Sequence, residues 1–375
     1  MKDLISQVEH AYYSETNQNK IKSTSKVKLF VGIGRPILSK VLNFSTLDYF
    51  SNANVCLESQ LKWKLFWHNE IQDDTPLDLT VGIDYATELE ATLFGMKGIS
   101  SEGTEPTYGE PIVHELEDIE KMTYPDFYKS GIMPKVHNMY EKIFDLANNR
   151  LKVYFPGWAR GTWSIATIIR GFNNLCFDVK DDPESLHKMM QFIVDSRISW
   201  ENQRFNFLNI KPTDKDYHWK YCVYRDISNS DMFEDEVDGN LFSPQMYREF
   251  VLPYEKQLSI YYGGISYYHS CGNLTPFLSD MLALNITNVL HISSWTDLAK
   301  AVEVFPENIT FQRSLHPINE VINADEKAMR KNLEEIIRAA NGRDLHICPD
   351  ALYEGSWHTI EKVKQIVRIF REITS

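Results

Sequence analysis

The stretch Tyr267-Tyr268-His269-Ser270-Cys271-Gly272-Asn273 ends one predicted strand and holds the most specific chemical pattern of the chain. Residues two apart in an extended strand point to the same side, so His269 and Cys271 can direct an imidazole and a sulfur at one point. A single distant cysteine, Cys348, follows another apolar run and is the expected partner of this pair. Because zinc binds imidazole and thiolate groups, the pair predicts half of a zinc site.

Apolar runs alternate with helical patterns along most of the chain. The expected strands cover residues 27–34, 77–84, 151–156, 219–223, 265–269, 288–292, 309–312 and 345–347. Strands separated by helices favour a parallel sheet, and eight of them favour a closed (β/α)₈ TIM barrel. A doubly wound open sheet is the alternative, but no Gly-x-Gly-x-x-Gly follows the first strand, which removes its commonest nucleotide-binding version.

The chain of 375 residues fits one large domain, because α/β barrels often reach this length as a single unit. Residues 1–26 are polar and predict an N-terminal surface extension with a helix at its start, and residues 27–375 predict the barrel. A polar excursion after the second strand contains Gly103, Pro106 and Gly109 and is too rich in turn formers for a regular element. Long loops inside a compact domain are often lids or covers of a site.

Composition restricts the classes of partner. A net charge of −13 supplies no basic face for nucleic acid or an anionic membrane. The N-terminus lacks the apolar core of a signal peptide, and no run of about 18 apolar residues appears, so we expect a cytoplasmic protein. Five cysteines are too few and odd in number for a disulfide framework, and we expect reduced thiols.

Strand ends decide where the chemistry lies. In a barrel, His269 and Cys271 would sit at the end of strand five and Cys348 at the end of strand eight, both at the mouth where active sites of this fold lie. A catalytic zinc keeps three protein ligands and an open fourth position, which a Cys₂His set matches. Such a zinc could hold a substrate thiol as thiolate, activate water or polarise a leaving group. The alternative is a satisfied polar histidine and two small buried cysteines.

Two carboxylates are candidate catalytic groups. The acidic run 231–238 includes Glu234, which could act as a general acid, and the run could also give a fourth metal ligand. A solvated acidic loop is the alternative for this run. Asp84 lies at the exit of the second strand, where it could face the pocket or only cap the next helix.

Aromatic and basic side chains near strand ends are candidate substrate contacts. Trp158 and Arg160 follow the third strand and could form a wall for a large planar ligand, although aromatic residues there are as often packing. Tyr267 precedes the proposed ligands on the same strand and is a further candidate. Three histidines lie in or near the last three predicted strands and could face the mouth or be structural: His291, His316 and His346.

The segment His269-Ser270-Cys271-Gly272-Asn273-Leu274-Thr275-Pro276 resembles the uroporphyrinogen decarboxylase superfamily, specifically its corrinoid-linked methyltransferase branch. The likeness continues in residues 239–250, in Pro253-Tyr254, and in Gly171-Phe172 leading to Asp181-Asp182-Pro183-Glu184. It covers the chain from about residue 150 to the end.

The resemblance implies a (β/α)₈ barrel and a zinc ion held by His269, Cys271 and Cys348. It also implies transfer of a methyl group between a corrinoid protein and a thiol or a methylated small-molecule donor. The cofactors would then be Zn²⁺ and a cobalamin carried by the partner protein, with the corrin received at the barrel mouth.

The chain departs from the superfamily pattern at two places. Decarboxylases of this superfamily grip substrate carboxylates with paired arginines after the first strand, whereas this chain keeps only Arg35 and has the His-x-Cys that they lack. After the seventh strand, Arg313 and His316 stand near a position where many members have Gly-Asn, and they could hold an anionic or aromatic substrate.

We therefore predict a zinc-dependent, corrinoid-linked methyltransferase. One alternative is a metal-free lyase that acts on a carboxylated substrate, in which Asp84 would match the pocket aspartate of the decarboxylases. Another is a corrinoid-binding accessory protein with a structural zinc and no turnover.

Overall fold

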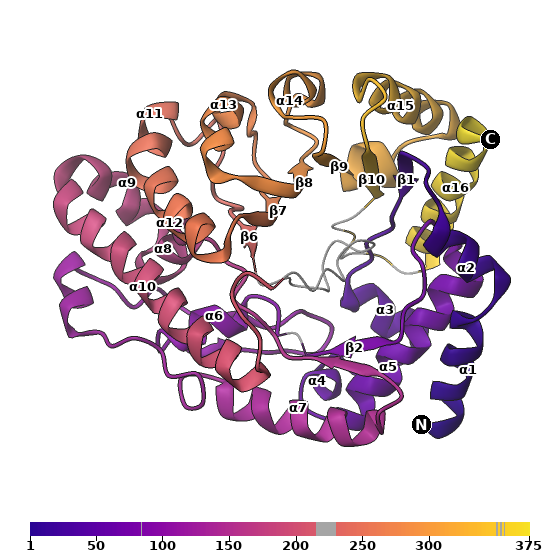
Figure 1. Ribbon diagram of the computed structural model, residues 1–375, viewed down its shortest axis with the longest axis horizontal. Coiled ribbons are helices and arrows are strands. Elements are labelled where there is room, and N and C mark those ends of the chain that lie inside the picture. Colours follow the sequence, from indigo (N-terminus) through magenta and orange to yellow (C-terminus); the bar gives the residue numbers. More distant parts are fainter. Residues whose placement is uncertain (84, 215–229, 350–351, 353–354, 356) are drawn as a thin grey trace.

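A computed structural model describes residues 1–83, 85–214, 230–349, 352, 355 and 357–375 of the chain. Eight parallel strands surround a central axis, and helices cover them on the outside (Figure 1). The predicted (β/α)₈ TIM barrel is confirmed.

Six of these strands form one continuous parallel sheet, and two more form a parallel pair. In spatial order the sheet contains β1 (Val27–Leu29), β10 (Leu345–Pro349), β9 (Thr310–Leu315), β8 (Ile286–Ile292), β7 (Ile265–His269) and β6 (Asp231–Phe233), and the pair contains β2 (Thr80–Gly82) and β5 (Lys152–Tyr154). A parallel bridge between Arg160 and Phe233 connects the loop after β5 to β6. The ring of strands is therefore held partly by ladders and partly by single contacts.

Side chains replace a ladder beside β1. Asp74 accepts a hydrogen bond from Leu29 N at 2.7 Å through its carboxylate, and its own backbone N–H donates to Leu29 O at 2.9 Å. Asp73 accepts from Val31 N at 2.8 Å, and its complete burial raises its pKa. These two residues give β1 the hydrogen-bond partners that a neighbouring strand would supply.

A strand that the sequence analysis did not predict lies beside β7. The strand predicted at 219–223 lies outside the described residues, and β6 takes the place beside β7. The acidic run therefore begins inside a barrel strand. Asp231 is buried there, and its carboxylate accepts a hydrogen bond from Ser266 Oγ at 2.8 Å.

The outer helices carry the rest of the core. Their bounds are α3 Arg35–Leu42, α4 Thr46–Tyr49, α5 Ala53–Phe66, α6 Glu88–Leu93, α7 Met133–Ala147, α8 Thr162–Arg170, α9 Phe172–Asp181, α10 Pro183–Leu208, α11 Pro244–Met246, α12 Leu252–Tyr262, α13 Leu278–Met281, α14 Leu298–Val304, α15 Glu326–Ala339 and α16 Trp357–Thr374. Asp182 caps α10 by accepting from Ser185 N, and Pro183 stands first in the helix.

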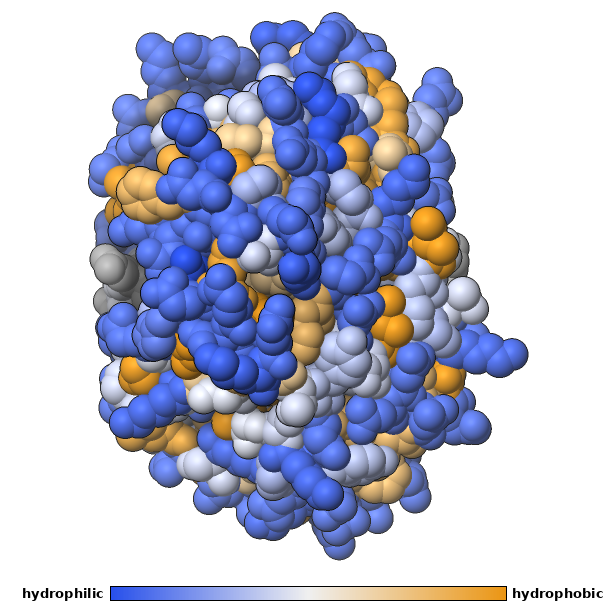
Figure 2. Space-filling view, turned by 90° about the vertical axis from the view of Figure 1, so that its left-hand side faces the viewer, coloured by the Kyte–Doolittle hydropathy of each residue, from blue (hydrophilic) through white to orange (hydrophobic). Residues whose placement is uncertain are grey.

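The outer surface is mainly hydrophilic with scattered apolar residues on the face shown in Figure 2. No helix within the described part of the chain is long and apolar enough to cross a membrane.

The polar excursion contains a small antiparallel hairpin of β3 (Gly98–Ile99) and β4 (Thr107–Tyr108), which the turn-rich sequence does not predict. Glu105, in the turn between them, pairs with Arg35 at the start of α3 at 2.6 Å. The excursion therefore reaches back over the carboxyl end of β1, where a cover of the barrel mouth would lie.

The N-terminal extension forms two helices, α1 (Lys2–Tyr12) and α2 (Glu15–Lys22). The expected helix at its start is confirmed, and it packs on α5 through buried Ile5 and Val8. Asn17 in α2 is fully buried, donates to Leu77 O at 2.9 Å and accepts from Leu77 N at 2.7 Å. The polar composition of this segment conceals its attachment to the barrel.

Replacing Asn17 with alanine should remove both bonds to Leu77 and leave two backbone groups without partners. We expect the free energy of unfolding in urea to fall by about 2 to 4 kcal/mol. Asn19, exposed on the same helix, is the matched control, and its alanine variant should stay within about 0.5 kcal/mol of the parent. Equal stability of the two variants would contradict the attachment.

Candidate metal centre at the barrel mouth

Three donor atoms meet at the carboxyl end of the barrel. His269 is the last residue of β7, Cys271 follows two residues later, and Asp235 lies two residues beyond β6. His269 Nε2 is 3.3 Å from Cys271 Sγ and 3.0 Å from Asp235 Oδ1. All three donor atoms lie within 4.8 Å of one another, close enough to share one metal ion.

Close backbone packing brings the two donor-bearing loops together. A Cβ on Gly272 would lie 2.4 Å from Val237 O, so only glycine allows this approach. Ser270 Oγ also donates to Val237 O at 2.9 Å. The glycine after the cysteine thus lets the segment carrying Cys271 lie against the segment carrying Asp235.

The His269 ring is fixed on both faces. The ring of His291 stacks on the His269 ring with 4.0 Å between the ring centroids, and the centroid of the Phe233 ring lies 5.0 Å from that of His269. Along its edge, Nδ1 lies 3.0 Å from the Tyr267 hydroxyl. The ring therefore has little freedom, and Nε2 points at the other two donors.

His291 has a structural role. Its Nδ1 lies 2.8 Å from Ser270 O and its Nε2 lies 2.7 Å from Ser314 Oγ, so both ring nitrogens have partners. Burial and the nearby His269 lower its pKa well below the usual range, which keeps the ring neutral.

The centre concentrates charge in a buried place. Burial alone would lower the pKa of His269, but the carboxylate of Asp235 and the sulfur of Cys271 raise it to about 10. Burial alone would raise the pKa of Asp235, but His269 and Arg160 hold it well below its usual range. The carboxylate and the sulfur favour a positive charge at Nε2, and either a proton or a metal ion could provide it.

Arg160 positions the carboxylate. Its Nη1 donates to Asp235 Oδ2 at 2.6 Å, which turns Oδ1 toward His269. The loop that carries Arg160 is held by buried carboxylates: Glu90 accepts from Arg160 N at 3.2 Å, and Glu201 accepts from Trp158 N at 2.9 Å.

Glu234 does not join the donor group. It is completely buried and accepts from Trp163 N at 3.2 Å and from Ser164 N at 3.1 Å, at the start of α8. Burial and nearby carboxylates raise its pKa well above the usual range. Neighbouring residues of an extended chain point to opposite sides, so Asp235 faces the mouth and Glu234 faces α8. The acidic run is therefore not a solvated loop.

Cys348 stands apart from the three-atom group of the described residues. It is fully buried in β10, pairs in register with Ser314, and belongs to an interior cluster with Tyr267, Val289 and Phe30. Because Tyr267 also contacts His269, Cys348 lies in the same part of the barrel. Its role as a metal ligand stays a prediction.

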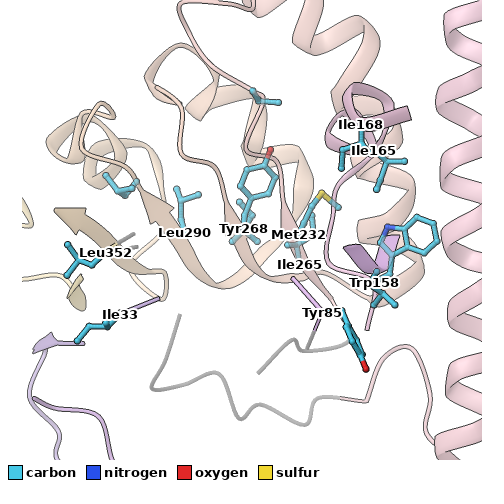
Figure 3. Packing of buried hydrophobic residues seen from close by; sticks show 14 of the residues in the cluster. Ile33, Tyr85, Trp158, Ile165, Ile168, Met232, Ile265, Tyr268, Leu290 and Leu352 are labelled. Carbon is cyan, nitrogen blue, oxygen red and sulfur yellow. The ribbon is translucent and has the colours of Figure 1, made fainter. Parts of the chain in front are cut away.

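The candidate substrate residues divide in the same way. Trp158 is buried, and Figure 3 shows it near the apolar side chains of Ile165 and Ile168. Its indole N–H donates to Arg160 O at 3.0 Å. This environment makes Trp158 part of the core. Arg160 and Tyr267 both contact the donor group, whereas Asp84 lies outside the described residues.

Arg313 and His316 have partners on and after β9, and their contact with a substrate stays a prediction. Gln312 and Ser314 contact Tyr267 and His291, so Arg313 points to the other face of β9, where it lies 3.4 Å from Glu320. His316 Nδ1 accepts backbone N–H bonds of 3.2 Å from residues 318 and 319 and so caps the short helical turn Pro317–Ile322.

Asp235 was predicted only as part of the acidic run that could give a fourth metal ligand, and Gln312 was not predicted at all. A strand placed at 231–233 would have put Phe233 and Asp235 on one face and so selected Asp235. Nothing in the local sequence distinguishes Gln312, because its importance comes from contact with Tyr267 across 45 residues.

Gly161 tests the support of the Arg160 loop. A Cβ there would lie 1.6 Å from Glu234 Oε1, so alanine should displace this carboxylate from α8 and cost about 2 kcal/mol of stability in urea unfolding. The control is Gly109→Ala, where the new Cβ would make an ordinary contact of 3.6 Å with Lys97 O. If both variants were as stable as the parent, Glu234 would not support the loop.

The chain is similar to known proteins in both sequence and fold. The model of the family described as "Uroporphyrinogen decarboxylase (URO-D)" matches residues 76–203 and 229–372. A solved structure described as a methyltransferase from Methanosarcina mazei is similar over 99% of this chain and 99% of that chain, with a TM-score of 0.66 and 15% identity. At this identity the likeness supports the fold alone.

A structure described as a vitamin-B12 independent methionine synthase from Listeria monocytogenes has 13% identity and a TM-score of 0.35, over 67% of this chain and 72% of that chain. This likeness is too weak to support an argument. No curated protein matches the chain. The family model, by contrast, covers well over half of the sequence and both segments that carry the donor group. The chain belongs to the uroporphyrinogen decarboxylase family.

Proposed function

We propose that this chain is a zinc-dependent methyltransferase of the corrinoid-linked kind, moving a methyl group between a corrinoid protein and a thiol or methylated small molecule. The observation that carries the proposal is the meeting of an imidazole nitrogen, a thiol sulfur and a carboxylate oxygen at the mouth of the barrel. The family match and the structural likeness to a protein described as a methyltransferase agree with it.

The donor set fits zinc. One nitrogen, one sulfur and one oxygen are all groups that zinc binds in proteins. Asp235 Oδ1 is buried and lies 3.0 Å from His269 Nε2. A buried carboxylate oxygen needs a positive partner, and a cation bound between these two atoms would supply one. His269, Cys271 and Asp235 would hold the ion, with Cys348 as the further predicted ligand.

When bound, zinc would supply a Lewis acid that keeps a thiol as thiolate or polarises the heteroatom of a methyl donor. The protein groups would decide access and orientation. Cys271 is exposed, whereas His269 is buried, so a reactant reaches the group from the Cys271 side. Arg160 would hold Asp235 in place beside it.

The metal-free lyase is less well supported. Its substrate carboxylates would need a cation after the first strand, but Arg35 there is paired with Glu105 at 2.6 Å and lies over the ring of Phe50 at 5.2 Å. We therefore favour the methyltransferase. The accessory protein without turnover shares the zinc site and differs only in activity.

Metal analysis tests the centre directly. Purified protein dialysed against zinc should retain about one equivalent, and Cys271→Ala should lose most of it because a ligand is removed. Cys176→Ala is the matched control, since Cys176 is also exposed but lies on α9, away from the donor group. Less than about half an equivalent in the parent, or equal retention by both variants, would contradict the proposal.

Turnover separates the enzyme from an accessory protein. We expect the zinc-loaded protein to convert methylcobalamin in the presence of a suitable thiol, or cob(I)alamin in the presence of a methylated donor, with the change followed by absorbance. A chelator should abolish the rate, and added zinc should restore it. A protein that holds zinc and shows no transfer across a broad panel of thiols and methylated donors would support the accessory role instead.

A further inference from the structure

A buried chain of polar groups stands behind the metal-facing histidine. The Tyr267 hydroxyl lies 3.0 Å from His269 Nδ1 and donates to Gln312 Oε1 at 2.7 Å. All three residues are at most 4% exposed, so these bonds are not shared with bulk solvent. Gln312 makes no contact with the donor group itself and acts only through Tyr267.

The direction of the bonds follows from their chemistry. A carbonyl oxygen only accepts, so the Tyr267 hydrogen points at Gln312 Oε1. The hydroxyl then presents a lone pair to His269, and Nδ1 must be the donor in the 3.0 Å contact. With the proton on Nδ1, the lone pair of a neutral imidazole is on Nε2, which faces Asp235 and Cys271.

The fold keeps this geometry rigid. Tyr267 and His269 are two residues apart on β7 and therefore point to the same face of the sheet. Gln312 on β9 is in register with His291 on β8, the strand between β7 and β9. His291 stacks on His269 and is itself bonded at both nitrogens. Strands of the same sheet thus hold all three hydrogen-bonded side chains in place.

We propose that Tyr267 and Gln312 are positioning residues that keep the His269 proton on Nδ1 and so leave Nε2 for the metal. This inference rests on the proposed zinc site. It assigns Tyr267 a part in holding the ligand, in place of the substrate contact expected from sequence. Outer groups of this kind commonly set the orientation of a metal-bound histidine.

Removal of Gln312 and removal of the Tyr267 hydroxyl should have different effects on zinc binding. Without Gln312, the Tyr267 hydroxyl loses the acceptor that directs its hydrogen away from His269. Donation to Nδ1 then favours the imidazole form with its proton on Nε2, which opposes metal binding. Without the hydroxyl, neither form of the ring is favoured. Removal of the distant glutamine should therefore weaken zinc binding more than removal of the hydroxyl that touches His269.

Zinc affinity, measured by competition with a chromophoric chelator, tests this in five full-length proteins. Gln312→Leu should weaken binding by about 10 to 100-fold, whereas Gln312→Glu keeps an acceptor and should bind like the parent. Tyr267→Phe should show a smaller loss. The double variant Tyr267→Phe/Gln312→Leu should bind more tightly than Gln312→Leu alone.

Controls separate this effect from general damage. Gln60→Leu removes a buried glutamine that bridges α5 to Gly82, so it should lower thermal stability without changing zinc affinity. Equal losses for Tyr267→Phe and Gln312→Leu that add in the double variant would overturn the positioning pair while leaving the zinc site intact. A parent that binds no zinc would overturn the proposed function and this inference with it.

Discussion

Buried carboxylates that accept backbone N–H bonds are the constraint on which this barrel depends. The ladder of strands is interrupted beside β1 and between β5 and β6, and an interrupted ladder leaves backbone groups without partners. Asp73 and Asp74 serve β1, while Glu90, Glu201 and Glu234 serve the loop and helix after β5. Some of the acidic side chains are therefore inside the fold, where they bond the backbone.

The same carboxylates determine where the charge of the mouth lies. Glu90 and Glu201 fix the loop that carries Arg160, and Arg160 fixes Asp235. Asp235 then faces His269 and raises its pKa despite the burial of the ring. The carboxylates that bond the backbone after β5 therefore also fix the charged groups beside His269.

The sequence predicts the barrel well because strand and helix periodicity is a local property. The stretch around His269 is recognisable for the same reason, since its two donors are two residues apart in one strand. The strand predicted at 219–223 lies outside the described residues, and the short strand β6 was not predicted. β6 has only three residues and starts with a buried aspartate, so it lacks the apolar pattern of a strand. Placing the strand earlier gave no reason to choose between Glu234 and Asp235.

Contacts between residues far apart in the sequence could not be predicted, because local sequence patterns carry no sign of them. Asn17, Gln312 and Arg160 have ordinary local sequences, and each matters because of a partner 45 to 75 residues away. Arg313 and His316 were chosen because they lie near a strand end, and the structure adds their partners: Arg313 lies 3.4 Å from Glu320, and His316 caps a helical turn.

Exposure distinguishes the parts of the centre from one another. His269, Tyr267 and Gln312 are buried and hydrogen-bonded to one another in series. Cys271 is exposed at the mouth, and the side chain of Asp235 is 26% exposed. A ligand set that is rigid on one side and open on the other can bind a metal in a defined place and still admit a reactant. The glycine that follows Cys271 makes this possible, because it lets the open edge of the site lie directly against the backbone beside Asp235.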